Sequence, residues 1–254
     1  MKSRRLTTIG LGIVAALSFA TAGCAGTTTT TAGTPGGDNG GAAKDPTVAL
    51  SQAAAELGKT SFAIKMLVGT AGQLTGAMDP QKKQGHFTLD MTSSGSSIKM
   101  ESRMVGGEMY IKITMPDSPL PGMDGKKWTR VTAGKAAGAM SSQLDASKIA
   151  QSLEHAASVE RVGDKGFKGT IDLTKATESL SLKSKDLGSL GEKAKAVPFE
   201  ATVDDKGRLV HYKINMPAIG GDPAQALDIT YSDFGTKVDV TAPPASEVIE
   251  KPGS

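Results

Sequence analysis

Hydrophobic and polar residues alternate along much of the chain. Between residues 62 and 115, apolar side chains occupy every second position in five successive segments, with charged or hydroxylic side chains between them. A period of two is typical of β-strands that bury one face. Short turns separate the segments, at residues 79–83 and at Gly106-Gly107 for example, and such turns predict hairpins. The pattern therefore predicts an antiparallel meander whose strands share one apolar face.

The alternation returns in shorter segments toward the C-terminus. They cover residues 128–131, 158–162, 166–173, 197–203, 208–216, 226–231 and 237–240. Together with the first five segments they predict about ten strands. We expect Pro243-Pro244 to end the sheet, because proline cannot donate a ladder hydrogen bond.

Two segments have the pattern of amphipathic helices, and the polar stretch 174–196 predicts a third, short helix with a loop. In the first, Asp45 is the expected N-cap, Pro46 the first helical residue and Gly58 the stop of a helix over 47–57. The second covers residues 142–157. An α+β fold with one sheet, wet on the back and covered by helices on the front, satisfies this pattern. A closed barrel is the alternative.

The N-terminus has the pattern of a secretory signal peptide over residues 1–23. Residues 1–5 are basic, and 6–19 are apolar but too short for a comfortable membrane span. Cleavage before Gly23 by an ordinary signal peptidase is one interpretation. The favoured one is a lipobox-like end in which Cys24, the single cysteine, becomes lipidated, although Thr21 replaces the usual leucine.

Residues 25–43 contain no large apolar side chain, so we expect a disordered tether. With Cys24 it forms the expected segment 24–43, followed by a folded domain over 44–248 and a tail over 249–254. A tether of this composition would hold the domain just off the outer face of the cell membrane, to which the lipidated cysteine anchors it.

Charge and composition exclude several classes of function. The formal net charge of +3 is carried entirely by the basic residues of the leader, so the mature chain is neutral. A neutral chain with interspersed charges argues against a nucleic-acid partner. One cysteine excludes intrachain disulfides and cysteine-based zinc clusters.

Signatures of catalysis are missing from the sequence. It has no G-x-S-x-G elbow, H-E-x-x-H motif, phosphate-binding loop or dinucleotide fingerprint. His86, His155 and His211 fall on different predicted elements. We therefore expect no enzymatic activity, no metal and no cofactor.

Methionine is concentrated on the predicted strand faces. Seven of the eleven methionines lie there, at positions 66, 78, 91, 100, 104, 109 and 115. Methionine is unbranched and adaptable, and it is common on surfaces that accept ligands of variable shape. A methionine-rich core explains the pattern equally well. Because the predicted helices are too few and short to cover ten strands, we expect a gap that accepts alkyl chains.

The C-terminal strands carry a family resemblance in the segments 197–204, 207–209, 229–235 and 238–244. With the lipobox-like leader and the tether, they resemble the LppX/LprG family of actinobacterial lipoproteins, which is related in fold to the LolA/LolB-type lipoprotein carriers. The resemblance implies one large antiparallel sheet curved into a half-barrel, with two or three helices across its concave face. It also implies a monomer that binds an acyl lipid or glycolipid in this cavity and carries it in the cell envelope, where a membrane transporter is a possible partner.

The resemblance places the ligand on the apolar strand faces. The expected cavity-lining residues are Ile64, Met66, Met78, Phe87, Leu89, Met91, Met100, Met104, Met109, Ile111, Ile113, Phe199, Val203, Ile214 and Ile229. The alternative function is an envelope-anchored interaction or signalling lipoprotein, with a filled core and a protein partner at its surface.

Overall fold

The structure is a computed structural model that describes residues 45–70, 72–93, 95–115, 125–131, 146–176, 187, 190–218 and 224–250. All of them belong to one compact unit, Ala42–Ser254. The predictions for the leader, Cys24 and the tether lie outside the described residues.

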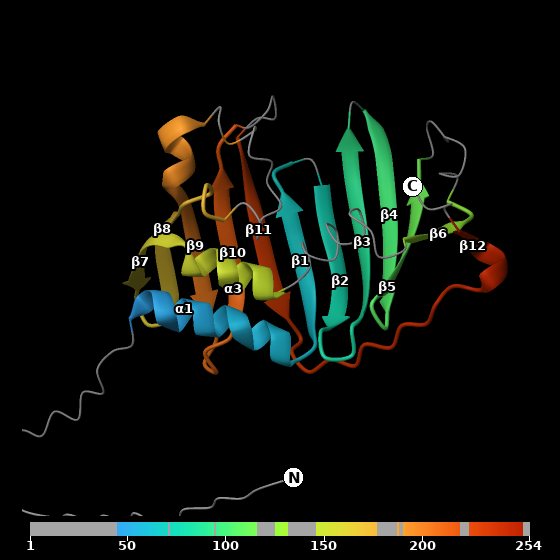
Figure 1. The fold of residues 1–254 in the computed structure, drawn as a ribbon, viewed down its shortest axis with the longest axis horizontal. Coiled ribbons are helices and arrows are strands. Elements are labelled where there is room, and N and C mark those ends of the chain that lie inside the picture. The colour runs from blue at the N-terminus through green and yellow to red at the C-terminus, as the bar shows by residue number, and fades with distance from the viewer. Residues whose placement is uncertain are drawn as a thin grey trace, which may run out of the picture. The chain divides into compact units, whose positions relative to one another are not determined.

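Twelve strands form one large sheet in the described part of the chain (Figure 1). They are β1 (Phe62–Val68), β2 (Gly72–Asp79), β3 (Gln84–Ser93), β4 (Ser96–Val105), β5 (Glu108–Thr114), β6 (Trp128–Val131), β7 (Ala156–Val162), β8 (Gly166–Ile171), β9 (Val197–Val203), β10 (Leu209–Met216), β11 (Gln225–Ser232) and β12 (Val248–Glu250). Their order is β12-β6-β5-β4-β3-β2-β1-β11-β10-β9-β8-β7. The sheet is not closed, since β12 and β7 are its two edges, so the closed barrel is wrong.

The expected meander is confirmed. Strands β1 to β5 are antiparallel neighbours in chain order. Gly106 and Gly107 form the two-residue turn between β4 and β5 with φ angles of 59° and 90°, and two such angles match the right-handed twist of the strands. At the β2–β3 turn, Lys83 adopts a φ of 52° and the Asp79 carboxylate accepts a hydrogen bond from the Lys82 N–H (3.1 Å).

The C-terminal strands differ from the prediction in two ways. Residues 237–240 form no strand, although Val238 and Val240 are buried and their neighbours are exposed. An extended chain lying against a surface alternates in burial without any ladder, which explains the misleading pattern. After Pro243-Pro244, a 3₁₀ turn η3 (Ala245–Glu247) leads into β12, which pairs with β6 in parallel. The sheet is therefore mixed rather than wholly antiparallel.

The first helix begins as its sequence predicts. In α1 (Pro46–Ala55), the Asp45 carboxylate accepts hydrogen bonds from the N–H groups of Thr47 (2.8 Å) and Val48 (3.3 Å), which satisfies two of the free donors of the first turn. The stop at Gly58 is wrong, because a 3₁₀ turn η1 (Glu56–Lys59) runs through that glycine.

The second helix, α3 (Ala146–Glu154), lies within the expected segment 142–157, whose first four residues are outside the described part. From the polar stretch 174–196, the structure describes a 3₁₀ turn η2 (Gly191–Lys195).

The largest hydrophobic core lies where the helices meet the sheet. The helices pack against each other, and α1 contacts β7 and β10; Figure 1 shows both lying over the part of the sheet from β7 to β11. Leu50, Leu57 and Leu153 are fully buried there against Phe199 and Ile214. Each buried leucine contributes roughly 1.5–3 kcal/mol relative to an exposed one.

Candidate functional site

The strand register brings all the expected cavity-lining residues to one face of the sheet, called here the apolar face. Directly paired residues of neighbouring strands point to the same side. Met66 pairs with Leu74 on β2 and with Ile229 on β11. Leu89 pairs with Met100, which in turn pairs with Ile113. The same row-by-row pairing connects β1 to β5 on one side and β11 to β8 on the other.

Burial divides this face into two regions. Phe199, Ile214 and Ile229 are at most 3% exposed and belong to the core that includes the helix residues. Across β1 to β5 many apolar side chains are only half-buried. We call this second group the methionine face, and its members are Met66, Leu74, Met78, Leu89, Met91, Ile98, Met100, Ile111 and Ile113.

The remaining expected residues lie outside the methionine face as defined here. Ile64, Phe87, Met104 and Met109 are buried on the apolar face, and Val203 packs at the margin of the core. Which of the expected residues contact a ligand stays a prediction. Leu74 and Ile98 share the methionine face but were missed as site residues, although their alternation places them on it.

Glycines shape the methionine face at its centre. A Cβ atom at Gly76 would lie 2.7 Å from Cδ1 of Phe87 and 2.2 Å from the carbonyl oxygen of His86. The Phe87 ring therefore lies across the glycine of the neighbouring strand, an arrangement that compensates a glycine within a sheet. Around this ring, four of the nine residues of the methionine face are unbranched methionines, which adapt readily to the shape of a partner, and the other five are leucines and isoleucines.

Two tyrosines on the apolar face were not predicted as site residues from the sequence. Tyr212 and Tyr231 are 2% and 3% exposed. Neither hydroxyl has a hydrogen-bond partner in the described part of the chain. Burial raises the pKa of both hydroxyls far above the ordinary value, so both are protonated donors. Their alternation with Ile214 and Ile229 predicts burial, but no local signal predicts that the hydroxyls lack partners.

The opposite face of the sheet is polar. Its buried Trp128 ring has the Arg103 guanidinium 4.6 Å and the Lys112 ammonium 4.8 Å from its centroid, and Lys112 forms an ion pair with Glu101 (2.8 Å). The C-terminal segment crosses here, and Arg103 donates a long hydrogen bond to the Thr241 carbonyl (3.4 Å). A hollow of about 340 Å³ lies between this segment and strands β3 and β4.

The three histidines lie apart. His86 lines the hollow on the polar face, His211 contacts the Asp228 carboxylate (2.9 Å), and His155 follows α3. In the described residues, no three or more His, Cys, Asp or Glu side chains gather as a metal site would require.

No helix of the described part of the chain is long and apolar enough to cross a membrane.

No protein-family model matches this chain, and no curated protein matches it either.

Proposed function

We propose that the protein is a lipoprotein of the cell envelope that binds an acyl lipid or glycolipid on the methionine face and carries it. The observation that supports this most is the row of half-buried apolar side chains, four of them methionines, that runs across five strands. The reverse side of the same strands is charged, so the apolar character belongs to one face only. A broad apolar face made of adaptable side chains suits flexible hydrocarbon chains.

In this proposal the sheet curves as a half-barrel, and the lipid chains lie along its concave face over β1 to β5, beside the part that the helices cover. No bond is made or broken. Each buried methylene contributes about 0.8 kcal/mol, so one long acyl chain contributes on the order of 10 kcal/mol before the costs of binding. The head group stays near the rim, where water solvates it.

The proposal includes anchoring through a lipidated Cys24, with the domain a monomer at the outer face of the membrane and a membrane transporter as its partner. Labelling living cells with a palmitate analogue tests the anchor. We expect the label on the wild type and its loss in Cys24→Ala. Equal labelling of both proteins would contradict the anchor but leave the lipid cavity untouched.

Two substitutions that fill space test the binding face. Met100→Trp and Ile111→Trp each place a large ring on it, whereas Lys99→Trp places the same ring on the polar side of β4 and serves as the control. The full-length proteins would be purified from the native host and analysed by native mass spectrometry with organic extraction. We expect acyl-lipid masses on the wild type and on Lys99→Trp, and none on the two variants of the methionine face.

Circular dichroism would establish that all four proteins are folded. Lipid on folded Met100→Trp and Ile111→Trp at the wild-type level would contradict the proposal. A lipid-free wild type that co-purifies with a stoichiometric protein would support the interaction lipoprotein instead.

A further inference from the structure

The hydroxyl groups of Tyr212 and Tyr231 form an unusual pair in the core. Tyr212 on β10 pairs with Ile229 on β11, and Tyr231 follows two residues later, so the tyrosines are diagonal neighbours on the apolar face. Each hydroxyl is buried, and neither has a partner among the described residues. Buried hydroxyls almost always have a hydrogen-bond partner, and leaving one without a partner is unfavourable.

The walls around these hydroxyls are almost entirely apolar. The Phe62 ring meets Tyr231 edge-on at 5.4 Å, and the Phe199 ring lies 5.8 Å from that of Tyr212. Ser152 of α3 is the polar side chain near Tyr212. Its hydroxyl donates to the Ile149 carbonyl (2.8 Å), and the Tyr212 hydroxyl lies near it without a hydrogen bond of regular geometry. A partner for the tyrosines must therefore bring its own acceptor oxygen into apolar surroundings.

Tyr231 lies at the border between the helix-covered core and the methionine face, and Tyr212 lies one strand further into the core. Tyr231 pairs with Ile64 on β1. One step along β1, Met66 pairs with Ile229 on the core side and with Leu74 on the methionine side. A hydrocarbon chain that follows the methionine face across β2 and β1 thus reaches the strand next to Tyr231, and Tyr212 lies on the strand after it.

We propose that Tyr212 and Tyr231 donate hydrogen bonds to an ester carbonyl oxygen of the bound lipid, and that the protein thereby selects ester-linked acyl lipids. This inference rests on the proposed lipid-binding function. An ester carbonyl is an isolated acceptor within an otherwise apolar molecule, and its oxygen has two lone pairs, one for each hydroxyl. The two donors on one side and the methionines on the other are thus complementary to the two parts of an acyl ester.

The test compares two lipids that differ only at the linkage. Dipalmitoyl phosphatidylcholine carries ester carbonyls, and its dihexadecyl ether analogue lacks them. Full-length protein stripped of bound lipid would be titrated with each, as the wild type, Tyr212→Phe and Tyr231→Phe. Tyr110→Phe is the matched control, since the chain has three tyrosines and this one donates to Glu108 (2.9 Å) on the polar face.

We expect Tyr212→Phe and Tyr231→Phe each to lower the affinity for the ester lipid about tenfold, the effect of one lost hydrogen bond. Affinity for the ether lipid should not change, and Tyr110→Phe should bind both lipids as the wild type does. Both core variants should fold, because phenylalanine keeps the ring and removes only the unpartnered hydroxyl. Circular dichroism checks this.

Two results would overturn the inference while leaving lipid binding intact. In one, the core variants bind the ester lipid as tightly as the wild type, which assigns the hydroxyls to a buried water. In the other, they lose affinity for both lipids equally, which assigns the tyrosines a purely structural role. Failure of the folded wild type to bind either phospholipid would instead refute the proposed function, and the inference with it.

Discussion

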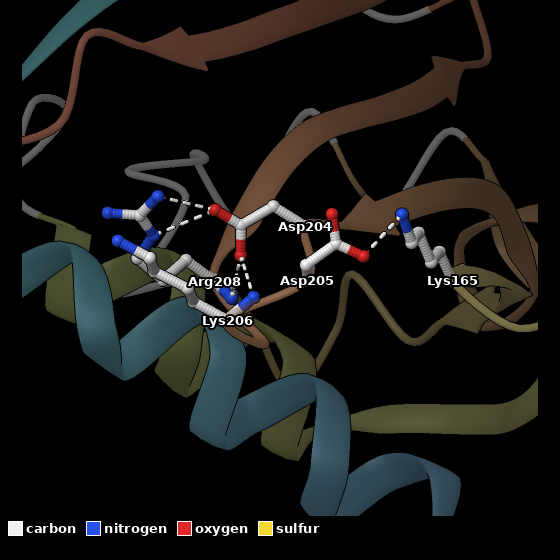
Figure 2. Close-up of polar contacts among 5 residues, drawn as sticks. All are labelled: Lys165, Asp204, Asp205, Lys206 and Arg208. Carbon is white, nitrogen blue, oxygen red and sulfur yellow. Dashed lines mark hydrogen bonds and ion pairs between the residues drawn. The ribbon is translucent and has the colours of Figure 1, made fainter.

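The turn between β9 and β10 offers a sharp test of how this sheet is stabilised. Figure 2 shows the Asp204 carboxylate at its centre. One oxygen, Oδ1, accepts hydrogen bonds from the N–H groups of Lys206 and Arg208, both at 2.9 Å. The other, Oδ2, accepts from Nε (2.8 Å) and Nη2 (2.6 Å) of Arg208. The same guanidinium lies 4.0 Å from the centroid of Phe234, so the turn is connected to the segment that follows β11.

Two substitutions separate these contacts. Asp204→Asn keeps an oxygen for the two backbone N–H groups and loses the ion pair. Because both side chains are 22% exposed, solvent weakens the pair, and we expect a loss of about 1 kcal/mol in the free energy of unfolding. Asp204→Ala removes all four hydrogen bonds, and we expect a loss of roughly 2–4 kcal/mol.

The pH dependence follows from the environment of Asp204. Partial burial acts to raise the pKa of this carboxyl, but the hydrogen bonds from the Arg208 side chain and from the N–H groups of Arg208 and Lys206 outweigh it and hold the pKa below its ordinary value. The folded state therefore binds this proton less readily than the unfolded state. Its contribution is fully present above the unfolded pKa and is lost as the pH falls through the lowered folded pKa.

Urea unfolding, followed by the fluorescence of the single tryptophan, Trp128, measures these changes at pH 7 and near pH 3. Asp205→Asn is the control, since its side chain is 87% exposed and pairs with the exposed Lys165 (2.7 Å); we expect no measurable change. The reasoning is refuted if Asp204→Asn behaves like this control at pH 7. It is also refuted if the difference between wild type and Asp204→Asn is as large near pH 3 as at pH 7.

Two further predictions concern the sheet and its C-terminal segment. Gly76→Ala should destabilise the protein by roughly 2–3 kcal/mol, because its Cβ would collide with Phe87 and the backbone beside it. Gly58→Ala, with open space at its Cβ, should leave the urea midpoint unchanged or raise it. Equal losses of stability in Gly76→Ala and Gly58→Ala would contradict the collision expected at Gly76. Ser61→Ala removes the hydrogen bond from the serine hydroxyl to the Thr236 carbonyl (2.6 Å). We expect faster cleavage of the C-terminal segment in limited proteolysis, and cleavage at the wild-type rate would show that this anchor is dispensable.

The side of the sheet on which each strand residue lies was predictable, because it depends on local sequence alone. A period of two decides which side of a strand a residue occupies, and the hairpin turns carry that choice from β1 to β5. The neighbours of non-consecutive strands are not local. The pairing of β1 with β11 joins residues more than 160 positions apart, as in Ile64 with Tyr231. The three-residue β12 follows two prolines and has no alternation to reveal it.

The residues of the candidate site were predictable from the sequence, but the division of the apolar face into a buried core and a half-buried methionine face was not. Phe199 and Met100 show the same alternation, yet one is 1% exposed and the other half-buried. The difference depends on which strands the helices reach, and this is a tertiary property. The unpartnered hydroxyls of Tyr212 and Tyr231 escaped for a related reason. Tyrosine suits a buried strand position, and only the neighbours brought together by folding decide whether its hydroxyl is satisfied.

The helix-covered core and the methionine face also differ in their roles, since the core stabilises the fold and the methionine face is available for binding. Among the described residues, the largest fully buried side chains come from α1, η1, β1, α3, β8 to β10 and the residues after β8, and β2 to β5 contribute none of them. Most of the burial that stabilises the fold thus lies outside the methionine face. A large ring at Ile214 would disrupt the core, whereas the same ring at Met100 meets a half-buried surface that has room to adjust. The methionine face can therefore exchange contacts with a lipid while the core beside it stays packed, and Tyr231 lies where the two regions meet, with Tyr212 on the next strand of the core.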